Sequence, residues 1–373
     1  MTDYILIAIS FLLSMACGYA FIPSIIRFCK KKGLYDLPNS RKVHKNAIPR
    51  LGGLSFLPSM LMASLIVMGI YSVQNGGNQI QMSLWSVGFF TSLALIYGVG
   101  IVDDLVGLGA RTKFVAQIIA AAVMPLCGLY VNSLYGFLGI GDIPFVIGAP
   151  FTVFVIVFMC NAINLIDGID GLSGGLSFIA LAGFLVCFMR EGLLFYGILI
   201  AGLMGVLIAF LYFNIFGRVE HDHKIFMGDS GSLTLGFILG FLAVKFTAIN
   251  PCVMSYHPDA LMLAYSFVVV PVFDVVRVSL VRIAHHRHIF QADKNHVHHK
   301  LMRTGCSQHQ VLGVILAMAV AYIVLNVVLW QLVCSDMTAI VAIDVAAWML
   351  FHYMLNRAIR SNGQPVFLEN NAD

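Results

Sequence analysis

The stretch Gly148–Gly171, GAPFTVFVIVFMCNAINLIDGIDG, decides how this chain folds. Residues 148–165 include no charged side chain, and a run this long and this apolar is typical of a helix that crosses a lipid bilayer. Asp167 and Asp170 follow it, at the expected edge of the hydrocarbon. Because carboxylates are costly near hydrocarbon, they usually mark a functional site there. The stretch therefore predicts a membrane protein with chemistry at the ends of its helices.

The composition of the whole chain points the same way. Hydrophobic residues make up 60% of the 373 positions and charged residues 11%, and the mean hydropathy is +0.90. A soluble core of this size does not need so much apolar surface. The eight cysteines include no CxxC pair, so neither a disulfide framework nor a zinc ribbon is indicated. We expect residues 1–373 to form a single polytopic membrane domain, without repeats.

The predicted fold is an all-α integral membrane protein with about eleven transmembrane helices. An odd number of spans places the two termini on opposite sides of the membrane. The predicted spans cover residues 4–26, 51–71, 83–101, 114–131, 148–165, 174–189, 192–213, 231–248, 260–281, 311–333 and 338–356.

The positive charges predict the side on which each loop lies, because cytoplasmic loops are enriched in Lys and Arg. The loops Ser72–Met82 and Asn132–Asp142 contain neither residue. We therefore expect the N-terminus outside and the C-terminus in the cytoplasm. The loop after the first span is strongly basic, with Arg27, Lys30, Lys31, Lys32, Arg41, Lys42, Lys45 and Arg50.

Five polar motifs fall on this same predicted side, because each follows an odd-numbered span. They are the basic first loop, the pair Asp103-Asp104, the stretch Asn161–Gly171, the turn Gly228–Ser230 and a histidine-rich loop after residue 281. Dispersed polar motifs that meet on one face are expected of a single site. The sequence thus predicts an active site at the cytoplasmic face.

Asp103 and Asp104 end the third predicted span. Adjacent side chains point to different faces of a helix, so one carboxylate can meet a metal while its neighbour meets a substrate or a cation. Repulsion between the two favours a cation nearby. The alternative is an ordinary helix end that pairs with Arg111 or Lys113.

Asn161, Asn164, Asp167 and Asp170 recur every three residues, which places them near one stripe of a helix. Glycines that permit turns interrupt the stripe. Oxygen-rich side chains beside such turns suit Mg²⁺ or a sugar nucleotide. A polar helix cap is the alternative, although a cap does not need four polar side chains.

Phe226 precedes the turn Met227–Ser232, which opens the eighth predicted span. Asp229 or Ser230 can cap that helix, and a helix N-terminus also attracts phosphate. The ring of Phe226 offers either a flat face for a stacked base or a buried apolar anchor. The sequence leaves both interpretations of each residue open.

Histidines are concentrated between the ninth and tenth predicted spans. Zinc binding is an alternative there, but no cysteine stands at ligand spacing. His296, His298 and His299 are better suited to donate hydrogen bonds to phosphate or sugar, and a solvated basic patch is the other alternative. In the first loop, Lys42 and His44 flank turn residues that can present them inward, although such a loop can also simply set topology and bind anionic lipid.

Together these motifs resemble the polyprenyl-phosphate N-acetylhexosamine-1-phosphate transferases. The Asp-Asp pair, NxxNxxDGxDGL, MGDSGS and HxHH occur in that order over nearly the whole chain. The segments SRKVHKNAIPRLGG and ADKNHVHHKL are similar to the WecA/TagO branch, which uses UDP-N-acetylglucosamine, whereas the peptidoglycan branch (MraY) differs there. The resemblance implies transfer of N-acetylglucosamine 1-phosphate to undecaprenyl phosphate. The products would be undecaprenyl-diphospho-N-acetylglucosamine and UMP, in the first membrane step of cell-surface polysaccharide synthesis.

The resemblance also implies roles for individual residues. Asp229 and Asn164 would hold Mg²⁺, with Mn²⁺ as an alternative ion. Asp103, Asp104 and Asp167 would form the catalytic group. The residues implied to bind the substrates are Lys42, His44, Lys113, Asn161, Asp170, Phe226, Lys294, His296, His298 and His299. Lys294 stands where arginine is common in this branch, and lysine cannot copy a bidentate arginine contact, so the choice of sugar is less fixed.

The implied partners are undecaprenyl phosphate, a UDP-sugar and membrane lipids, with no nucleic acid and with a homodimer left open. The implied location is a bacterial inner (cytoplasmic) membrane. Another UDP-N-acetylhexosamine or UDP-N-acetylmuramoyl-pentapeptide is the alternative donor. A membrane transporter is a more distant alternative, because transporters place polar groups near the bilayer midplane, often in related halves.

Overall fold

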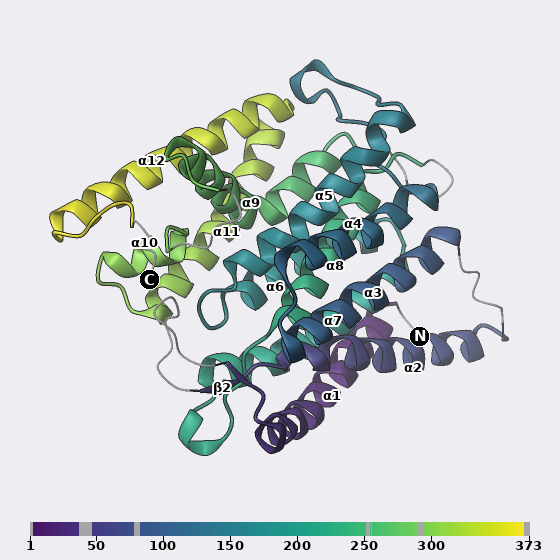
Figure 1. Ribbon diagram of the computed structural model, residues 1–373. Helices are drawn as coiled ribbons and strands as arrows, with labels where there is room; N and C mark the ends of the chain where they lie inside the picture. The colour runs from purple at the N-terminus through teal and green to yellow at the C-terminus, as the bar shows by residue number, and fades with distance from the viewer. Residues whose placement is uncertain are drawn as a thin grey trace.

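The computed structural model describes residues 3–36, 47–77, 83–250, 254, 256–288 and 294–368. Helices dominate it, as predicted, and β1 (Tyr35–Asp36) and β2 (Ile48–Pro49) form a short antiparallel pair (Figure 1). The long helices are α1 (Asp3–Lys32), α2 (Phe56–Gln74), α3 (Leu84–Val106), α4 (Ala110–Leu126), α5 (Phe145–Ile166), α6 (Leu172–Arg190), α7 (Leu194–Leu211), α8 (Asp229–Thr247), α9 (Ala260–Ala284), α11 (Gln308–Leu332) and α12 (Met337–Ser361). The short elements are α10 (Val297–Arg303), the 3-10 turns η1 (Gly52–Ser55), η2 (Phe137–Gly139) and η4 (Val219–His221), and the π-helical turn η3 (Tyr212–Phe216).

Each predicted span overlaps one of the long helices. Among the described residues, ten helices are long and apolar enough to cross a membrane. The helix outside that group is α4, which has 17 residues and carries Arg111 and Lys113 in its first turn. The integral-membrane fold class is therefore supported, whereas the eleventh span and the sides of the termini stay predictions.

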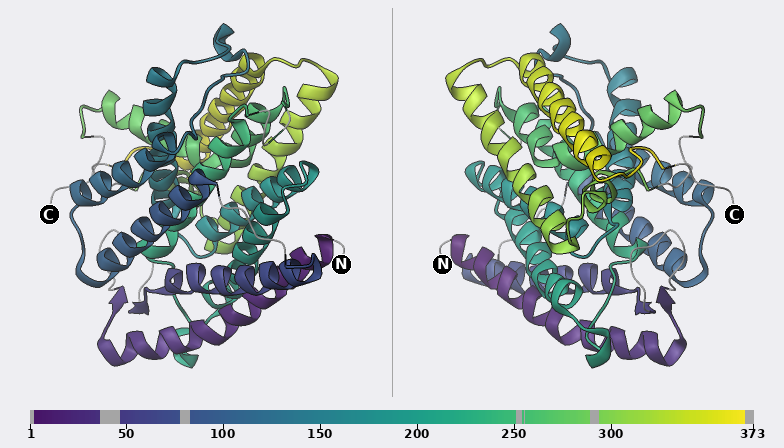
Figure 2. Two further views of the ribbon diagram at one scale, coloured as in Figure 1. Left: turned by 90° about the vertical axis from the view of Figure 1, so that its right-hand side faces the viewer. Right: turned by 90° about the vertical axis from the view of Figure 1, so that its left-hand side faces the viewer.

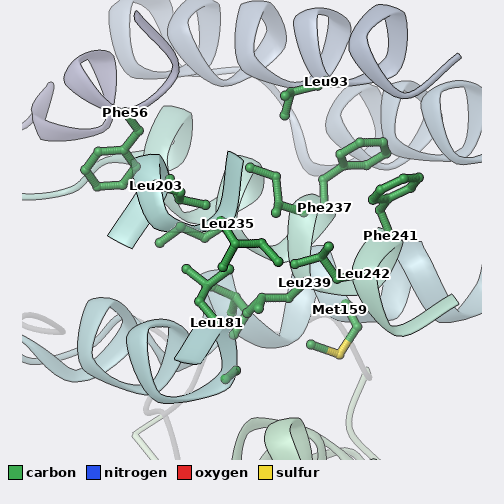
Figure 3. Close-up of a cluster of buried hydrophobic side chains, with 14 of the residues drawn as sticks. Phe56, Leu93, Met159, Leu181, Leu203, Leu235, Phe237, Leu239, Phe241 and Leu242 are labelled. Carbon is green, nitrogen blue, oxygen red and sulfur yellow. The ribbon is translucent and has the colours of Figure 1, made fainter. Parts of the chain in front are cut away.

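The central helix of the bundle is α8. Every residue from Ser230 to Leu242 is buried, and α3, α5, α6 and α9 pack against this helix. A helix that is apolar on all sides either crosses a membrane facing lipid or lies in a protein core, and the burial of α8 by its neighbours places it in the core of the bundle. The two views of Figure 2 place α1 and α2 on one side of the bundle and α11 and α12 on the other. Figure 3 shows the core around α8, with Phe56, Leu93, Met159, Leu181, Leu203, Leu235, Phe237, Leu239, Phe241 and Leu242.

The first loop and the segment before α8 are held together by their backbones. Phe226 N donates to Pro49 O over 2.7 Å, Gly52 N donates to Phe226 O over 2.8 Å, and Gly53 N donates to Met227 O over 2.7 Å. Backbone groups paired in this way fix the start of α8 against η1. The chain therefore brings its first loop to the same place as the ends of α3 and α5.

Candidate active site

A cavity of about 570 Å³ lies where α3 and α5 end and α8 begins. This volume is in the range of small-molecule sites, roughly 300–1,000 Å³. The loop around β2 and the beginning of α11 complete its wall. The predicted site residues that line it are Asp103, Asp104, Lys113, Asn164, Asp167, Asp170, Phe226, Asp229 and His299.

Asp229 is the meeting point of three helices at this cavity. Lys113 Nζ, from α4, lies 2.7 Å from Asp229 Oδ2 and 3.1 Å from Asp103 Oδ2. Asn164 Nδ2, from α5, donates to Asp229 Oδ1 over 2.8 Å and to Ser232 Oγ over 2.9 Å. Burial lowers the pKa of Lys113, but the carboxylates of Asp229 and Asp103 outweigh that effect and raise it overall. Lys113 is therefore a fixed cation between two carboxylates.

Asp104 has a different task from its neighbour. Its two carboxylate oxygens accept hydrogen bonds from the backbone N–H groups of Asp229 (2.8 Å) and Ser230 (3.0 Å). Asp104 thus supplies, from α3, the acceptors that the first turn of α8 lacks, since α8 has no side-chain cap of its own. Gly228 has a φ of +75°, and a Cβ there would come within 2.6 Å of Asp104 Oδ2. Asp104 therefore positions Asp229.

Asp103 instead ends α3 and faces the cavity. Its Oδ1 accepts from Leu108 N over 2.6 Å, in the turn between α3 and α4, while Oδ2 contacts Lys113. The adjacent acids point to different partners, as expected of neighbours on a helix.

The oxygen donors around Asp229 fit a magnesium ion. Among the described residues no group of three or more His, Cys, Asp and Glu side chains is arranged to hold a metal. Mg²⁺ needs fewer protein ligands, because it is commonly held by one or two carboxylates together with substrate phosphates and water. The carboxylates of Asp103 and Asp229 already pair with one positive charge, the ammonium of Lys113. Asn164 would turn its amide oxygen toward such an ion.

Asp167 and Asp170 line the cavity beyond the end of α5, in different surroundings. Asp167 is accessible from the cavity, yet enclosure by protein and then the charge of Asp229 raise its pKa to about 8. A cation bound nearby would lower that pKa again. Asp170 Oδ2 accepts from Lys224 Nζ over 2.7 Å, and Lys224 also donates to the backbone oxygen of Asn214. Asp170 thus forms an ion pair with Lys224.

Phe226 and Arg50 also line the cavity, next to the start of α8. Phe226 is partly exposed at the cavity. The Nε of Arg50 is buried and has no hydrogen-bond partner in the part of the chain that the structure describes. Lys42 and His44 lie outside the described residues, and their predicted contacts stay predictions.

The histidines divide into one that lines the cavity and two that do not. His299 lies at the wall, and burial followed by neighbouring cationic groups lowers its pKa to about 4. His298 is 1% exposed and lies behind Gly168, where a Cβ would come within 2.2 Å of His298 Nε2. His296 is also buried and donates from Nδ1 to Asp274 Oδ2 over 2.8 Å. The structure therefore brings only His299 to the cavity, because the turn of α10 directs the other two rings into protein.

Two further predicted contacts lie away from the cavity. Asn161 donates to Gln117 Oε1 over 2.6 Å and to Val157 O over 2.8 Å, so it joins α5 to α4. The backbone oxygen of Lys294 accepts from Arg303 over 3.1 Å, and Lys294 is not among the residues that line the cavity. A stripe with a three-residue period drifts around a helix, which explains why Asn164 faces the cavity and Asn161 does not.

Sequence reasoning missed several polar lining residues, namely Asp36, Arg50, Asn214 and Gln308. In the sequence, Arg50 stands out only as one of the basic residues that predict the side of the first loop. Asn214 follows a predicted span directly, which is the same signal that singled out the acids, so it could have been found.

Comparison with known proteins identifies relatives over most of the chain. The description "Glycosyl transferase family 4" matches residues 84–247. A probable undecaprenyl-phosphate N-acetylglucosaminyl 1-phosphate transferase of Bacillus subtilis (strain 168) is 33% identical over 83% of this chain and 81% of the relative. An undecaprenyl-phosphate alpha-N-acetylglucosaminyl 1-phosphate transferase of Yersinia pestis is 28% identical over 94% and 90%. A decaprenyl-phosphate N-acetylglucosaminephosphotransferase of Mycobacterium leprae (strain TN) is 34% identical over 74% and 71%.

Proposed function

The chain belongs to glycosyl transferase family 4, the polyprenyl-phosphate N-acetylhexosamine-1-phosphate transferases, and we propose that it transfers N-acetylglucosamine 1-phosphate from UDP-N-acetylglucosamine to undecaprenyl phosphate. The products are undecaprenyl-diphospho-N-acetylglucosamine and UMP. The names of the Bacillus and Yersinia relatives support this sugar and this lipid. The resemblance of the first loop and the histidine loop to the WecA/TagO branch supports the same donor.

The observation that carries the proposal is that four side chains meet at one cavity, those of Asp103, Lys113, Asn164 and Asp229. These residues come from four helices, α3, α4, α5 and α8, and their polar atoms lie 2.7–3.1 Å apart. Joining two phosphate groups requires that their mutual repulsion be offset. Lys113 supplies positive charge at the cavity, and a divalent ion held at Asp229 would add to it where the donor and acceptor phosphates meet.

Magnesium at Asp229 and Asn164 is part of the proposal, with Mn²⁺ as the alternative ion. When bound, the ion would neutralise the diphosphate of the donor and favour its departure as UMP. Lys113 and Arg50 bind phosphate oxygens from the protein side. Asp104 holds Asp229 in position through the backbone of α8.

The chemistry proposed is direct attack by an oxygen of the lipid phosphate on the sugar-linked phosphorus of the donor. The new phosphorus–oxygen bond replaces the bridging bond, whose electron pair leaves with UMP. A phosphate monoester loses its second proton near pH ~6, so the acceptor does not need a strong base at neutral pH. Asp103 orients the acceptor or takes a residual proton.

A two-step route through a phosphorylated aspartate is the competing chemistry. Incubation with labelled donor alone distinguishes the two routes. Label retained on the denatured protein would support the covalent route. Release of UMP only when both substrates are present supports direct transfer.

We place the site at the cytoplasmic face of a bacterial inner membrane. The apolar helices and bacterial relatives support a multi-pass bacterial membrane protein. The basic loops lie on the same side as the cavity residues in the predicted topology, which supports the cytoplasmic face. The acceptor is anchored in lipid, so a site at the ends of spans suits it.

UMP release by the purified protein tests the proposal. The assay contains undecaprenyl phosphate, Mg²⁺ and either UDP-N-acetylglucosamine or UDP-N-acetylmuramoyl-pentapeptide, each with a chelator control. Chelator-sensitive turnover of the first donor alone is the expected result. Turnover of the second donor alone would move the protein to the peptidoglycan branch, and no turnover of either would contradict the proposed activity.

A further inference from the structure

Asp274 is a buried acid that the proposed reaction does not use directly. It lies in the cytoplasmic half of α9 as predicted from the loop charges, its exposed fraction is 0%, and it does not line the cavity. Its carboxylate accepts from Arg277 Nη2 (3.1 Å), His296 Nδ1 (2.8 Å) and Val297 N (2.9 Å). A buried carboxylate with three donors is a fixed point of the structure.

Two of those donors belong to the segment that carries the histidines. Val297 is the first residue of α10, and His296 is its N-cap. Because α10 has only seven residues, it is too short to keep a fixed position by its own helix stability. The contacts of Asp274 therefore hold the start of α10 against α9. Since a carboxylate only accepts hydrogen bonds, this pairing also requires hydrogen on Nδ1 of His296.

The rings of α10 connect Asp274 to the cavity. His296 and His298 are stacked with centroids 5.9 Å apart and planes 9° apart, and the centroids of His298 and His299 are 4.2 Å apart. His299 lines the cavity. A shift of His296 would therefore be passed through packed rings to His299.

The other end of α10 is held by different elements. Lys300 Nζ donates to Asn356 Oδ1 of α12, and Arg303 donates to the backbone oxygens of Pro365 (2.9 Å) and Val366 (3.3 Å). These contacts keep α10 attached when its start is released. Loss of the Asp274 contacts should consequently misplace the histidines and leave the rest of the bundle folded.

We infer that Asp274 is a positioning residue that sets His299 against the donor, which rests on the function proposed above. The chemistry that His299 meets is that of a sugar diphosphate. Its neutral ring, bordered by Lys294 and Arg303, can donate a hydrogen bond to that group. The kinetic effect of releasing α10 should therefore fall on the donor and leave the KM for the lipid acceptor unchanged.

Asp274→Asn tests this inference, with Asp344→Asn as the matched control. Asp344 also has an exposed fraction of 0% and also lies inside a long helix, α12, but it accepts from Asn326 of α11 and does not contact α10. Backbone hydrogen exchange of residues 296–303 is measured by mass spectrometry on the purified proteins, alongside kcat and KM for each substrate.

We expect Asp274→Asn to speed exchange in residues 296–303 and to lower kcat/KM for the donor about 10- to 100-fold, as small misplacements at active sites do. Asp344→Asn should change neither. Faster exchange with unchanged donor kinetics, or equal effects of both variants, would overturn the inference. A wild-type protein that releases no UMP with any donor would instead defeat the proposed function, whatever the exchange result.

Val297→Pro provides the second variant if Asp274→Asn does not fold. Proline is tolerated at the first position of a helix, and the φ of −60° and ψ of 157° at His296 suit a residue before proline. The change removes the backbone N–H that donates to Asp274 and replaces the buried Val297 side chain by an apolar ring. We expect faster exchange in α10 and a smaller loss of donor kcat/KM, and wild-type values for both would overturn the inference.

Discussion

Replacing Asp104 by asparagine should loosen the start of α8, whereas the same change at Asp103 should not. Asp104 accepts from two backbone N–H groups of α8, those of Asp229 and Ser230. Asparagine has a single acceptor oxygen, so its NH₂ group would face one of those donors. At Asp103, an asparagine oxygen can still accept from Leu108, and Lys113 keeps its contact with Asp229.

The two changes therefore differ in energy. Hydrogen bonds to charged groups contribute about 1.5–3 kcal/mol each, and a buried donor left without an acceptor costs about 1–3 kcal/mol. For Asp104→Asn we expect a loss of about 2–4 kcal/mol. For Asp103→Asn we expect about 1 kcal/mol, because a neutral hydrogen bond to Leu108 replaces a charged one and Lys113, which is partly exposed, keeps its shorter contact with Asp229 when its contact with Asp103 is weakened.

Thermal unfolding and UMP release of the purified proteins, measured together, test this difference. Asp104→Asn should lower both the midpoint of unfolding and the rate, because Asp229 is displaced. Asp103→Asn should keep a midpoint close to that of the wild type and lose most of the rate. An unchanged midpoint for Asp104→Asn, or equal destabilisation by both changes, would refute the capping role of Asp104.

Three further changes test other parts of the site. Gly168→Ala should lower the midpoint of unfolding, because the new Cβ would lie 2.2 Å from His298 Nε2. Adding His298→Ala to the same chain should recover part of the loss. No recovery would contradict that contact. Without divalent metal, the stability of the wild type relative to Asp167→Asn should fall as pH rises from about 4 to 8. In this range the folded state holds a proton on Asp167, whose pKa is raised to about 8, whereas the unfolded state has released it. A stability difference that does not change with pH would contradict the raised pKa. EDTA should abolish UMP release and added Mg²⁺ should restore it, whereas activity in EDTA would rule out the metal.

The sequence was a good guide to the helices and a poorer one to the segments between them. Apolar runs near twenty residues long are typical of membrane helices, and each predicted run overlaps a helix, although α4 is not among the ten that are long and apolar enough to cross a membrane. The helix α10 was not predicted, because its seven residues lie in a polar loop and depend on Asp274, Asn356 and the C-terminal segment. The backbone hydrogen bonds between Pro49–Gly53 and Phe226–Met227 likewise join segments that are far apart in the sequence, so no local pattern predicts them.

For the site, the sequence identified which motifs meet but not how each side chain is used. Asp229, Asn164 and Lys113 are in contact, as their positions at the ends of spans suggested. The capping of α8 by Asp104 depends on a contact across 125 positions, which no local pattern reveals. The burial of His298 behind Gly168 likewise depends on tertiary packing.

The most direct test of the central claim follows the phosphorus itself, with wild-type protein and Asp229→Asn side by side. Each receives undecaprenyl phosphate, Mg²⁺ and UDP-N-acetylglucosamine labelled at the sugar-linked phosphorus. The account predicts that the wild type moves the label into the lipid fraction as UMP is released, and that folded Asp229→Asn does not. Label that leaves as inorganic phosphate, or transfer by Asp229→Asn at a rate near that of the wild type, would contradict it.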